Sequence, residues 1–216
     1  MELTENKLLS KTFMWMFIGL AITFGIGFYV SCNENMMYNL FMGYKWIILV
    51  ILELGIVFAL SMFIEKLIPL VAKILFCVYA LITGLTFSAI FVVYELGSII
   101  YVFGVTSIVF LIFSLLGYYT KMDLSKLGTY LFMALLAIII ASVINIFIGS
   151  SMLELGITIV ALIVFIGYVA YDIYMIRQSG KFAQSENMPI FWALQLYIDF
   201  INLFIRLIRL LGKERN

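Results

Sequence analysis

The sequence contains no histidine and only two cysteines among its 216 residues. Without histidine, most hydrolase triads cannot form, and a response to pH near neutrality requires carboxyl groups in an unusual environment. Cys32 follows one apolar stretch and Cys77 lies inside another, so a disulfide is not expected. No zinc or haem ligand set can be assembled from these residue types. We therefore expect no enzyme activity and no bound cofactor.

Charge is also scarce, because only 12% of the residues are charged and 65% are hydrophobic. An ordinary soluble domain has about 25% charged and about 45–50% apolar residues. So few polar groups could not cover the surface of a soluble domain, and the composition predicts an integral membrane protein in contact with the lipid bilayer. The net charge of +1 and the lack of a basic run argue against a nucleic-acid partner.

Apolar runs near the length of about 20 residues that a bilayer requires recur along the chain. They predict seven transmembrane helices at about 12–31, 46–64, 74–94, 98–119, 128–148, 155–176 and 190–211. The connections are short and hold no inserted soluble domain, so neighbouring helices should be antiparallel. The sequence predicts one all-α integral membrane domain over residues 1–216.

Short local signals accompany these spans. Asn187, two residues before a proline, is expected to start the last helix. Asp123 and Ser125 are expected to cap the start of the fifth span. The small residues Gly84 and Ser88, four apart in the third span, should permit a close approach between helices.

Lys and Arg indicate how this domain is oriented. A cytoplasmic N-terminus places eight basic residues on the inner side, where positive charge is favoured, against only Lys45 in the first three outer loops. The eight are Lys7, Lys11, Lys66, Lys73, Lys121, Lys126, Arg177 and Lys181. The tail departs from this rule, because seven crossings place its four basic residues outside. Either the earlier loops prevail or the last segment does not fully cross, and we favour seven crossings.

The last predicted span contains an unusual stripe of polar residues. Gln195, Asp199, Asn202, Arg206 and Arg209 are spaced four, three, four and three apart, which puts them on one helix face. Facing lipid, the stripe would be prohibitively costly, so we expect it to face the bundle. Polar contacts between helices explain Gln195 and Asn202. For Asp199 we favour a functional role, because intramembrane acids most often mark ion or proton paths.

Besides Asp199, two acids lie inside predicted spans, namely Asp172, in "GYVAYDIYMIRQ", and Glu53. Asp172 and Asp199 both fall in the inner half of the bilayer if the N-terminus is inside. Should they approach each other, they would titrate as a coupled pair that shares one proton. Pairing of Asp172 with Arg177 is an equal alternative. Glu53 is either an attraction site at the outer mouth or a partner of Lys45, and the latter is slightly favoured.

Several stretches resemble the transmembrane Bax inhibitor motif family, in particular its compact bacterial branch. They are "YALITGLTFSAI" (79–90), "LLGYYTKMDLSKLGTYL" (115–131) and "YDIYMI" followed by "LYIDFINLFIRLIRLLG" (171–212). The resemblance implies six helices in two layers around a central seventh helix. It also implies a bacterial plasma-membrane location and a pH-sensitive calcium leak channel.

The same resemblance assigns roles to residues. It implies a latch and pH sensor at Asp172 and Asp199, with Glu53 as the acid of the second helix; Asn202 joins these three in the predicted ion path. A basic cluster that some relatives have is absent, and Lys66 or Arg206 could substitute for it as a partner of the aspartates.

Calcium is expected as the permeant ion, held only weakly by the two aspartates, because tight calcium sites use six to eight oxygen ligands. Two other functions remain open at this point. One is a non-transporting stress-protection protein that modulates a membrane protease or another membrane partner. The other is a proton-coupled cation exchanger that uses the same aspartates.

Overall fold

A computed structural model describes residues 2–179 and 186–215 of the chain. Within these ranges every regular element is helical. The α-helices are α1 (Glu2–Ser31), α2 (Glu34–Phe41), α3 (Lys45–Phe63), α4 (Pro69–Val93), α5 (Leu96–Tyr119), α6 (Leu127–Ile148), α7 (Ser151–Ser179) and α8 (Met188–Leu211). A short 3₁₀ turn, η1 (Ile64–Lys66), follows α3. The all-α prediction is confirmed.

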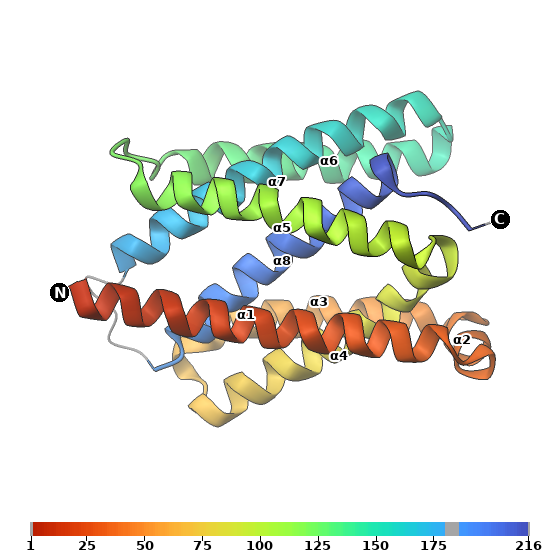
Figure 1. Cartoon of the computed structure of the whole chain (residues 1–216), viewed down its shortest axis with the longest axis horizontal. Coiled ribbons are helices and arrows are strands. Elements are labelled where there is room, and N and C mark those ends of the chain that lie inside the picture. Colours follow the sequence, from red (N-terminus) through yellow and green to blue (C-terminus); the bar gives the residue numbers. More distant parts are fainter. Residues whose placement is uncertain (1, 180–185, 216) are drawn as a thin grey trace.

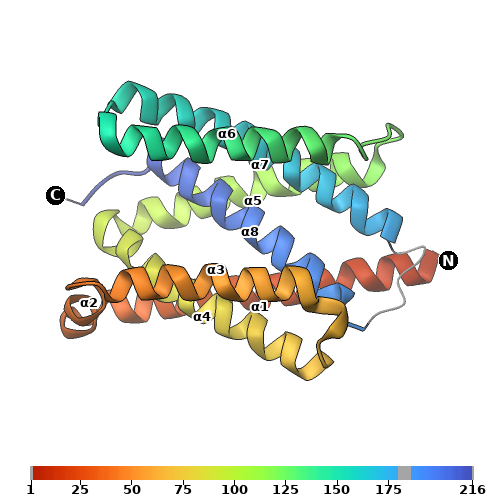
Figure 2. The same cartoon turned by 180° about the vertical axis from the view of Figure 1, so that it is seen from behind.

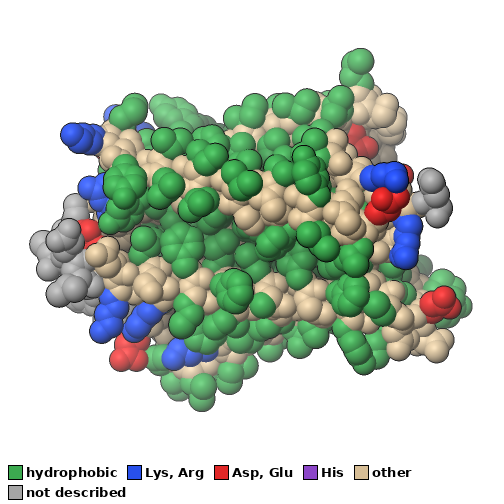
Figure 3. Space-filling view, viewed as in Figure 1, with side chains coloured by type: hydrophobic (Ala, Val, Ile, Leu, Met, Phe, Trp, Pro, Cys, Tyr) green, Lys and Arg blue, Asp and Glu red, His purple; other side chains and the backbone are tan. Residues whose placement is uncertain are grey.

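Seven of these helices are long and apolar enough to cross a membrane, as predicted. A span of 24 residues, such as α8, is about 36 Å long at 1.5 Å per residue, which exceeds the hydrocarbon thickness of a bilayer. Large apolar side chains cover the flanks of the molecule, whereas charged side chains gather at its two ends (Figure 3). This distribution is that of a membrane-spanning bundle.

Local sequence signals explain several helix boundaries. Pro69 opens α4, where its missing N–H costs no hydrogen bond. Gly149 ends α6 in the left-handed conformation, with φ of 68°, and its N–H donates to the carbonyl of Asn145 at 2.7 Å. The predicted start of the last helix at Asn187 is correct, but the Asn187 side chain does not cap α8. Its Nδ2 donates instead to the carbonyls of Ile64 and Leu67, at 2.7 Å each.

The prediction that Asp123 and Ser125 cap the helix that begins near residue 128 is wrong. Lys126 is the capping residue of α6 and makes no side-chain cap. Asp123 Oδ1 instead accepts hydrogen bonds from the Ser125 N–H at 2.9 Å and from the Tyr174 hydroxyl at 3.1 Å. The aspartate therefore closes a turn within the loop and ties that loop to α7.

These contacts predict a pH-dependent contribution to stability from Asp123. The side chain and backbone N–H of Ser125, followed by the Tyr174 hydroxyl, lower the pKa of Asp123 below its usual value. A carboxyl group whose pKa is lower in the folded state stabilises the fold above its unfolded value of about 3.9 and loses this effect as pH falls through the folded pKa. Thermal unfolding in detergent should therefore show Asp123→Asn less stable than the native chain at pH 6. The difference between the two melting temperatures should shrink as pH falls below about 3.9, and a difference that does not change with pH would contradict this origin.

Helix α8 runs obliquely through the middle of the bundle (Figures 1 and 2). Helices α1, α3 and α4 lie on one side of it, and α5, α6 and α7 lie on the other. Within an apolar stretch of 18 residues in each span, 61% of the stretch is buried in α8, against 11% in α3 and in α6. The last helix is therefore the most enclosed of the spans, whereas α3 and α6 are peripheral.

The two ends of the chain lie at opposite ends of the bundle (Figure 1). We call the end that contains the start of α1, the turn between α3 and α4 and the start of α8 the N-terminal end. The opposite end, where α8 finishes at Leu211, is the C-terminal end. The described chain thus runs between the two ends along seven long helices, and the basic tail lies away from the start of α1. Lys181, one of the basic residues used to predict orientation, lies outside the described residues.

The tail is attached to the connection between α4 and α5. The Glu95 N–H donates to the carbonyl of Lys213 at 3.0 Å, and the Arg215 N–H donates to the carbonyl of Val93 at 2.8 Å. Lys213 Nζ also lies 2.7 Å from Glu95 Oε1. These contacts hold the segment after α8 against the C-terminal end of the bundle.

Candidate functional site

Two acidic side chains meet in the interior of the bundle. Asp172 of α7 and Asp199 of α8 have their carboxyl groups within hydrogen-bonding reach of each other. Their exposed fractions are only 6% and 5%. At 1.5 Å per residue, Asp172 lies about 10 Å along α7 from its end, and Asp199 about 16 Å along α8 from its start. The pair therefore lies within the bundle, toward its N-terminal end.

The pair is embedded in apolar packing between α7 and α8. Residues one turn before and after each aspartate are buried on the same helix faces; they are Val169 and Ile176 in α7 and Leu196 and Leu203 in α8. Hydrophobic residues at this helical spacing fix how the two helices pack, and their packing brings the carboxyl groups together. The surrounding apolar side chains keep water from stabilising two separate charges.

The two carboxyl groups face each other with few other polar neighbours. A carboxylate can only accept hydrogen bonds, so a hydrogen bond between two carboxyl groups would need one of them to be protonated. Among the described residues, no N–H or hydroxyl group donates to Asp199 Oδ2. Two charged carboxylates here would face each other as like charges in an apolar setting.

Arg177 does not pair with Asp172, although the sequence left that pairing open. Its Nη1 donates to the carbonyls of Tyr118 at 2.7 Å and Thr120 at 3.5 Å, at the end of α5. Arg177 therefore ties α7 to α5 at the N-terminal end.

Neither of the other expected basic partners is placed on the pair. Lys66 Nζ lies 5.9 Å from the centroid of the Phe63 ring, in the turn after α3. Arg206 lines a pocket at the C-terminal end, beside Arg209 and Glu154. Within the described part of the chain, no ion pair joins Lys66 or Arg206 to either aspartate.

The polar stripe of α8 does not face the interior as expected. Gln195, Asn202 and Arg206 are only half-buried and Arg209 is exposed, whereas Asp199 is buried. With 3.6 residues per turn, Asp199 lies at one edge of the stripe, about 40° from Gln195 and about 20° from Arg206 around the helix axis. Asp199 is therefore the most enclosed member of the stripe. Asn202 donates to the carbonyl of Ile198, in its own helix, at 2.9 Å.

Glu53 has a different partner from the one favoured by the sequence. The Thr86 hydroxyl of α4 donates to Glu53 Oε1 at 3.0 Å, and no described contact joins Glu53 to Lys45. The hydroxyl of Thr83, one turn before Thr86, has no hydrogen-bond partner among the described residues. Glu53 is therefore held by the Thr86 hydroxyl at the contact of α3 and α4.

Sequence reasoning missed a second buried polar cluster, on α1, α4 and α8. The hydroxyl groups of Thr23 and Tyr197 lie 2.5 Å apart, and Thr23 also donates to the carbonyl of Ala80 at 2.9 Å. Thr83 is also buried, and its hydroxyl has no hydrogen-bond partner among the described residues. A hydroxyl in an apolar span is common, so only the repeat of Thr83 and Thr86 at helical spacing could have indicated this cluster.

Seven apolar helices, enclosed acidic side chains and charged ends define an integral membrane protein with a polar interior site. The family model described as "Inhibitor of apoptosis-promoting Bax1" matches residues 5–216. The chain belongs to this Bax inhibitor family, as its resemblance predicted.

Similar proteins occur in several bacteria. The inner membrane protein YbhL of Escherichia coli K12 is 39% identical, over 96% of this chain and 92% of its own length. An uncharacterized protein of Borreliella burgdorferi is also 39% identical, over 99% of this chain and 95% of its own length. A protein of Deinococcus radiodurans is 38% identical, over 96% of this chain and 90% of its own length. The description of YbhL as an inner membrane protein agrees with a membrane location for this family.

Proposed function

We propose that the protein is a pH-sensitive cation leak pathway, permeable to calcium, in which Asp172 and Asp199 form the gate. The observation that supports this proposal is the meeting of the two carboxyl groups in the apolar contact between α7 and α8. Intramembrane acids are costly, and they commonly mark ion or proton paths. A purely structural polar contact could use neutral side chains at lower cost.

The proposed gate closes when the pair holds a proton. In that state the hydrogen bond joins α7 to α8 near the N-terminal end. After the proton leaves, two charges about 4 Å apart repel by about 4 kcal/mol at an effective dielectric constant near 20. The helices then separate, or a cation enters between the carboxylates. Either change opens a route that the protonated pair blocks.

Calcium suits this site as a transient ligand. Two carboxylates and a few carbonyl groups give fewer oxygen atoms than the six to eight of a tight calcium site. Weak binding favours conduction, because an ion must leave as readily as it enters. Among the described residues, no cluster of three or more His, Cys, Asp or Glu side chains is placed to hold a metal. Glu53, which accepts a hydrogen bond from Thr86, is a second acidic position along the proposed route.

The proposed orientation follows the positive-inside rule. The N-terminal end of the bundle contains Lys7, Lys66, Lys73, Lys121 and Lys126, so we place it on the cytoplasmic side. The aspartate pair then lies toward the cytoplasm of a bacterial cell, and its protonation follows cytoplasmic pH.

Calcium efflux from proteoliposomes across pH 5 to 8 tests the function. Efflux should be low at pH 5 and rise toward pH 8 as the pair loses its proton. One arm sets only a calcium gradient and another adds a proton gradient. Flux that needs the proton gradient would support an exchanger instead. Flux equal to that of empty vesicles, with folded protein, would favour a non-transporting partner of a membrane protease or another membrane protein.

A further inference from the structure

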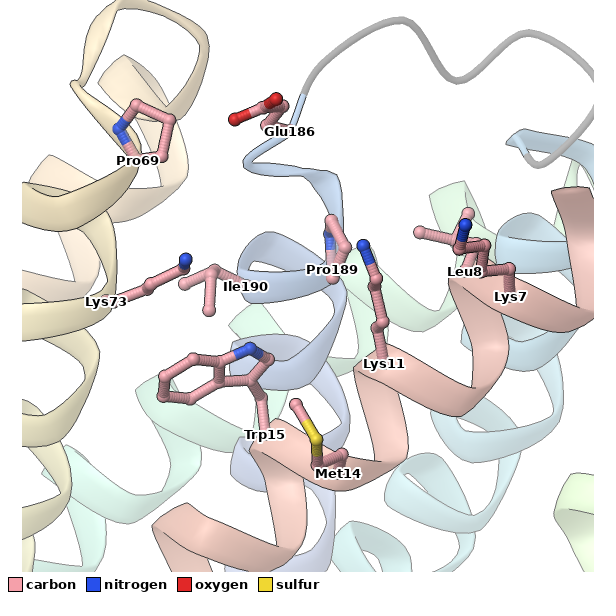
Figure 4. A pocket seen from close by; sticks show the side chains of 10 residues that line it. All are labelled: Lys7, Leu8, Lys11, Met14, Trp15, Pro69, Lys73, Glu186, Pro189 and Ile190. Atoms are coloured by element: carbon pink, nitrogen blue, oxygen red, sulfur yellow. The ribbon is translucent and has the colours of Figure 1, made fainter.

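A basic pocket lies at the N-terminal end of the bundle (Figure 4), and neither aspartate of the pair lines it. Its volume is about 690 Å³, within the usual range of small-molecule sites. It is lined by Lys7, Leu8, Lys11, Met14, Trp15, Pro69, Lys73, Glu186, Pro189 and Ile190. The residues come from α1, α4 and the start of α8, so the pocket exists only when these three elements are assembled.

The lysines approach the pocket from two helices. Lys73 extends from α4 and Lys11 from α1, on opposite sides of the start of α8, and Lys7 lies one turn before Lys11 at the rim (Figure 4). None of these lysines forms an ion pair with another described residue. Glu186 is the single acid in the lining. The pocket therefore holds three lysines against one acid, and keeps an excess of positive charge.

The helix starts add to the positive potential. Helix α4 begins at Pro69 and α8 begins at Met188, and residues of both first turns line the pocket. The dipole of a helix gives its start a partial positive charge. Pro69 and Pro189 carry no N–H and the Ile190 N–H donates to the Asn187 carbonyl at 2.9 Å, so the lysine side chains are the groups that can bind an anion directly.

The floor of the pocket is apolar and leads onto the lipid-facing flank. The Trp15 ring lies below Lys73 and Ile190, and Met14 lies beside it (Figure 4). Met14 is 51% exposed and Phe17, one turn further along α1, is 72% exposed. Apolar surface thus continues from the pocket toward the middle of the bundle. Tryptophan is typical of the level at which lipid headgroups meet the hydrocarbon.

We propose that this pocket binds the phosphate-containing headgroup of an anionic phospholipid, with the acyl chains along Met14 and Phe17. Basic pockets between membrane helices commonly take such headgroups. The lysines bind the phosphate, and the apolar flank favours a ligand with attached chains over a free anion. The bound lipid joins α1 to α4 at the point where α8 begins.

Lipid titration of the full-length protein in detergent tests the proposal. Dioctanoyl phosphatidylglycerol should raise the melting temperature in a saturable manner, because a ligand that binds only the folded state stabilises it. Dioctanoyl phosphatidylcholine and inorganic phosphate, at equal concentration and ionic strength, should have little effect. Phosphate that acts as strongly as the lipid would overturn the lipid assignment, and phosphatidylcholine that does so would overturn a site selective for anions.

A matched pair of double variants locates the site. Lys11→Gln with Lys73→Gln should weaken the affinity for phosphatidylglycerol by about tenfold or more at low salt. Lys121→Gln with Lys126→Gln removes the same charge from the same end of the bundle, but neither residue lines the pocket, so affinity should change little. Equal losses in both variants would overturn the site. Lys11→Arg with Lys73→Arg keeps the positive charge and should retain binding. This result would show that the glutamine variant binds weakly because it lost charge, and not because substitution at these positions disturbs folding.

Discussion

Replacing Asp199 with Asn should abolish the pH dependence of calcium flux. An amide always has N–H groups to donate, so the new side chain would keep a hydrogen bond to Asp172 at every pH. The variant should therefore show the low flux of the protonated pair throughout pH 5 to 8. In the native chain, the fraction of deprotonated pairs changes by up to about tenfold per pH unit below its midpoint. Calcium efflux from proteoliposomes at matched protein density measures the pH dependence of the variant and of the native chain.

Two companion variants make this experiment decisive. Asp172→Asn should behave like Asp199→Asn, because each removes one of the two acids that share the proton. Glu154→Gln removes an exposed acid at the opposite end, where it pairs with Arg209 at 3.3 Å, and should leave the pH profile unchanged. An unchanged profile in Asp199→Asn would refute the aspartate gate. A shifted profile in Glu154→Gln would place the sensor elsewhere.

Gly117→Ala should strongly destabilise the bundle. Gly117 of α5 lies directly against the backbone of α7 at Ala170, and an added methyl group would collide with the Ala170 carbonyl. The clash is with backbone, so a side-chain movement cannot relieve it and the two helices must move apart. Overpacking typically costs about 1–3 kcal/mol and occasionally more. We expect a cost at or above the upper end of this range, measured by thermal or denaturant unfolding in detergent.

Gly104→Ala provides the matched control for that prediction. Gly104 lies in the same helix, and an added methyl group there meets no atom within 4 Å. Alanine has the higher helix propensity by about 1 kcal/mol, so this variant should be as stable as the native chain or slightly more stable. A similar loss of stability in both variants would show that helix α5 tolerates no alanine, rather than that Gly117 sets its distance from α7. Since Ala170 is two residues before Asp172, Gly117→Ala should also disturb the aspartate pair.

The spans were predictable because bilayer thickness imposes a strong and simple signal on sequence. Long apolar runs fixed seven helices, and Asn187 with Pro189 located the start of α8. The eight-residue helix α2 was missed, because its length falls far below that signal and it depends on Asn33, whose side chain accepts from the Met36 N–H at 3.1 Å. The close approach expected at Gly84 is present, since a methyl group there would lie 2.9 Å from Ile26 Cβ.

The site was predictable only in part. Asp172 and Asp199 were evident as charges inside apolar runs, but helical spacing gives angles only about the axis of one helix. It cannot specify the rotation of α8 against α7, which separates buried Asp199 from its half-buried neighbours Gln195 and Asn202. For the same reason the sequence could not distinguish Thr86 from Lys45 as the partner of Glu53. Such choices depend on how several helices pack at once.

The central position of α8 has a consequence for biosynthesis. Among the long helices of the described residues, this helix is made after the other six, yet it lies between α1, α3 and α4 on one side and α5, α6 and α7 on the other. The earlier helices therefore reach the membrane before their shared packing surface has been made. A chain that stops before residue 188 exposes the polar and aromatic surfaces that α8 covers. Synthesis of α8 is therefore a condition for closing the bundle.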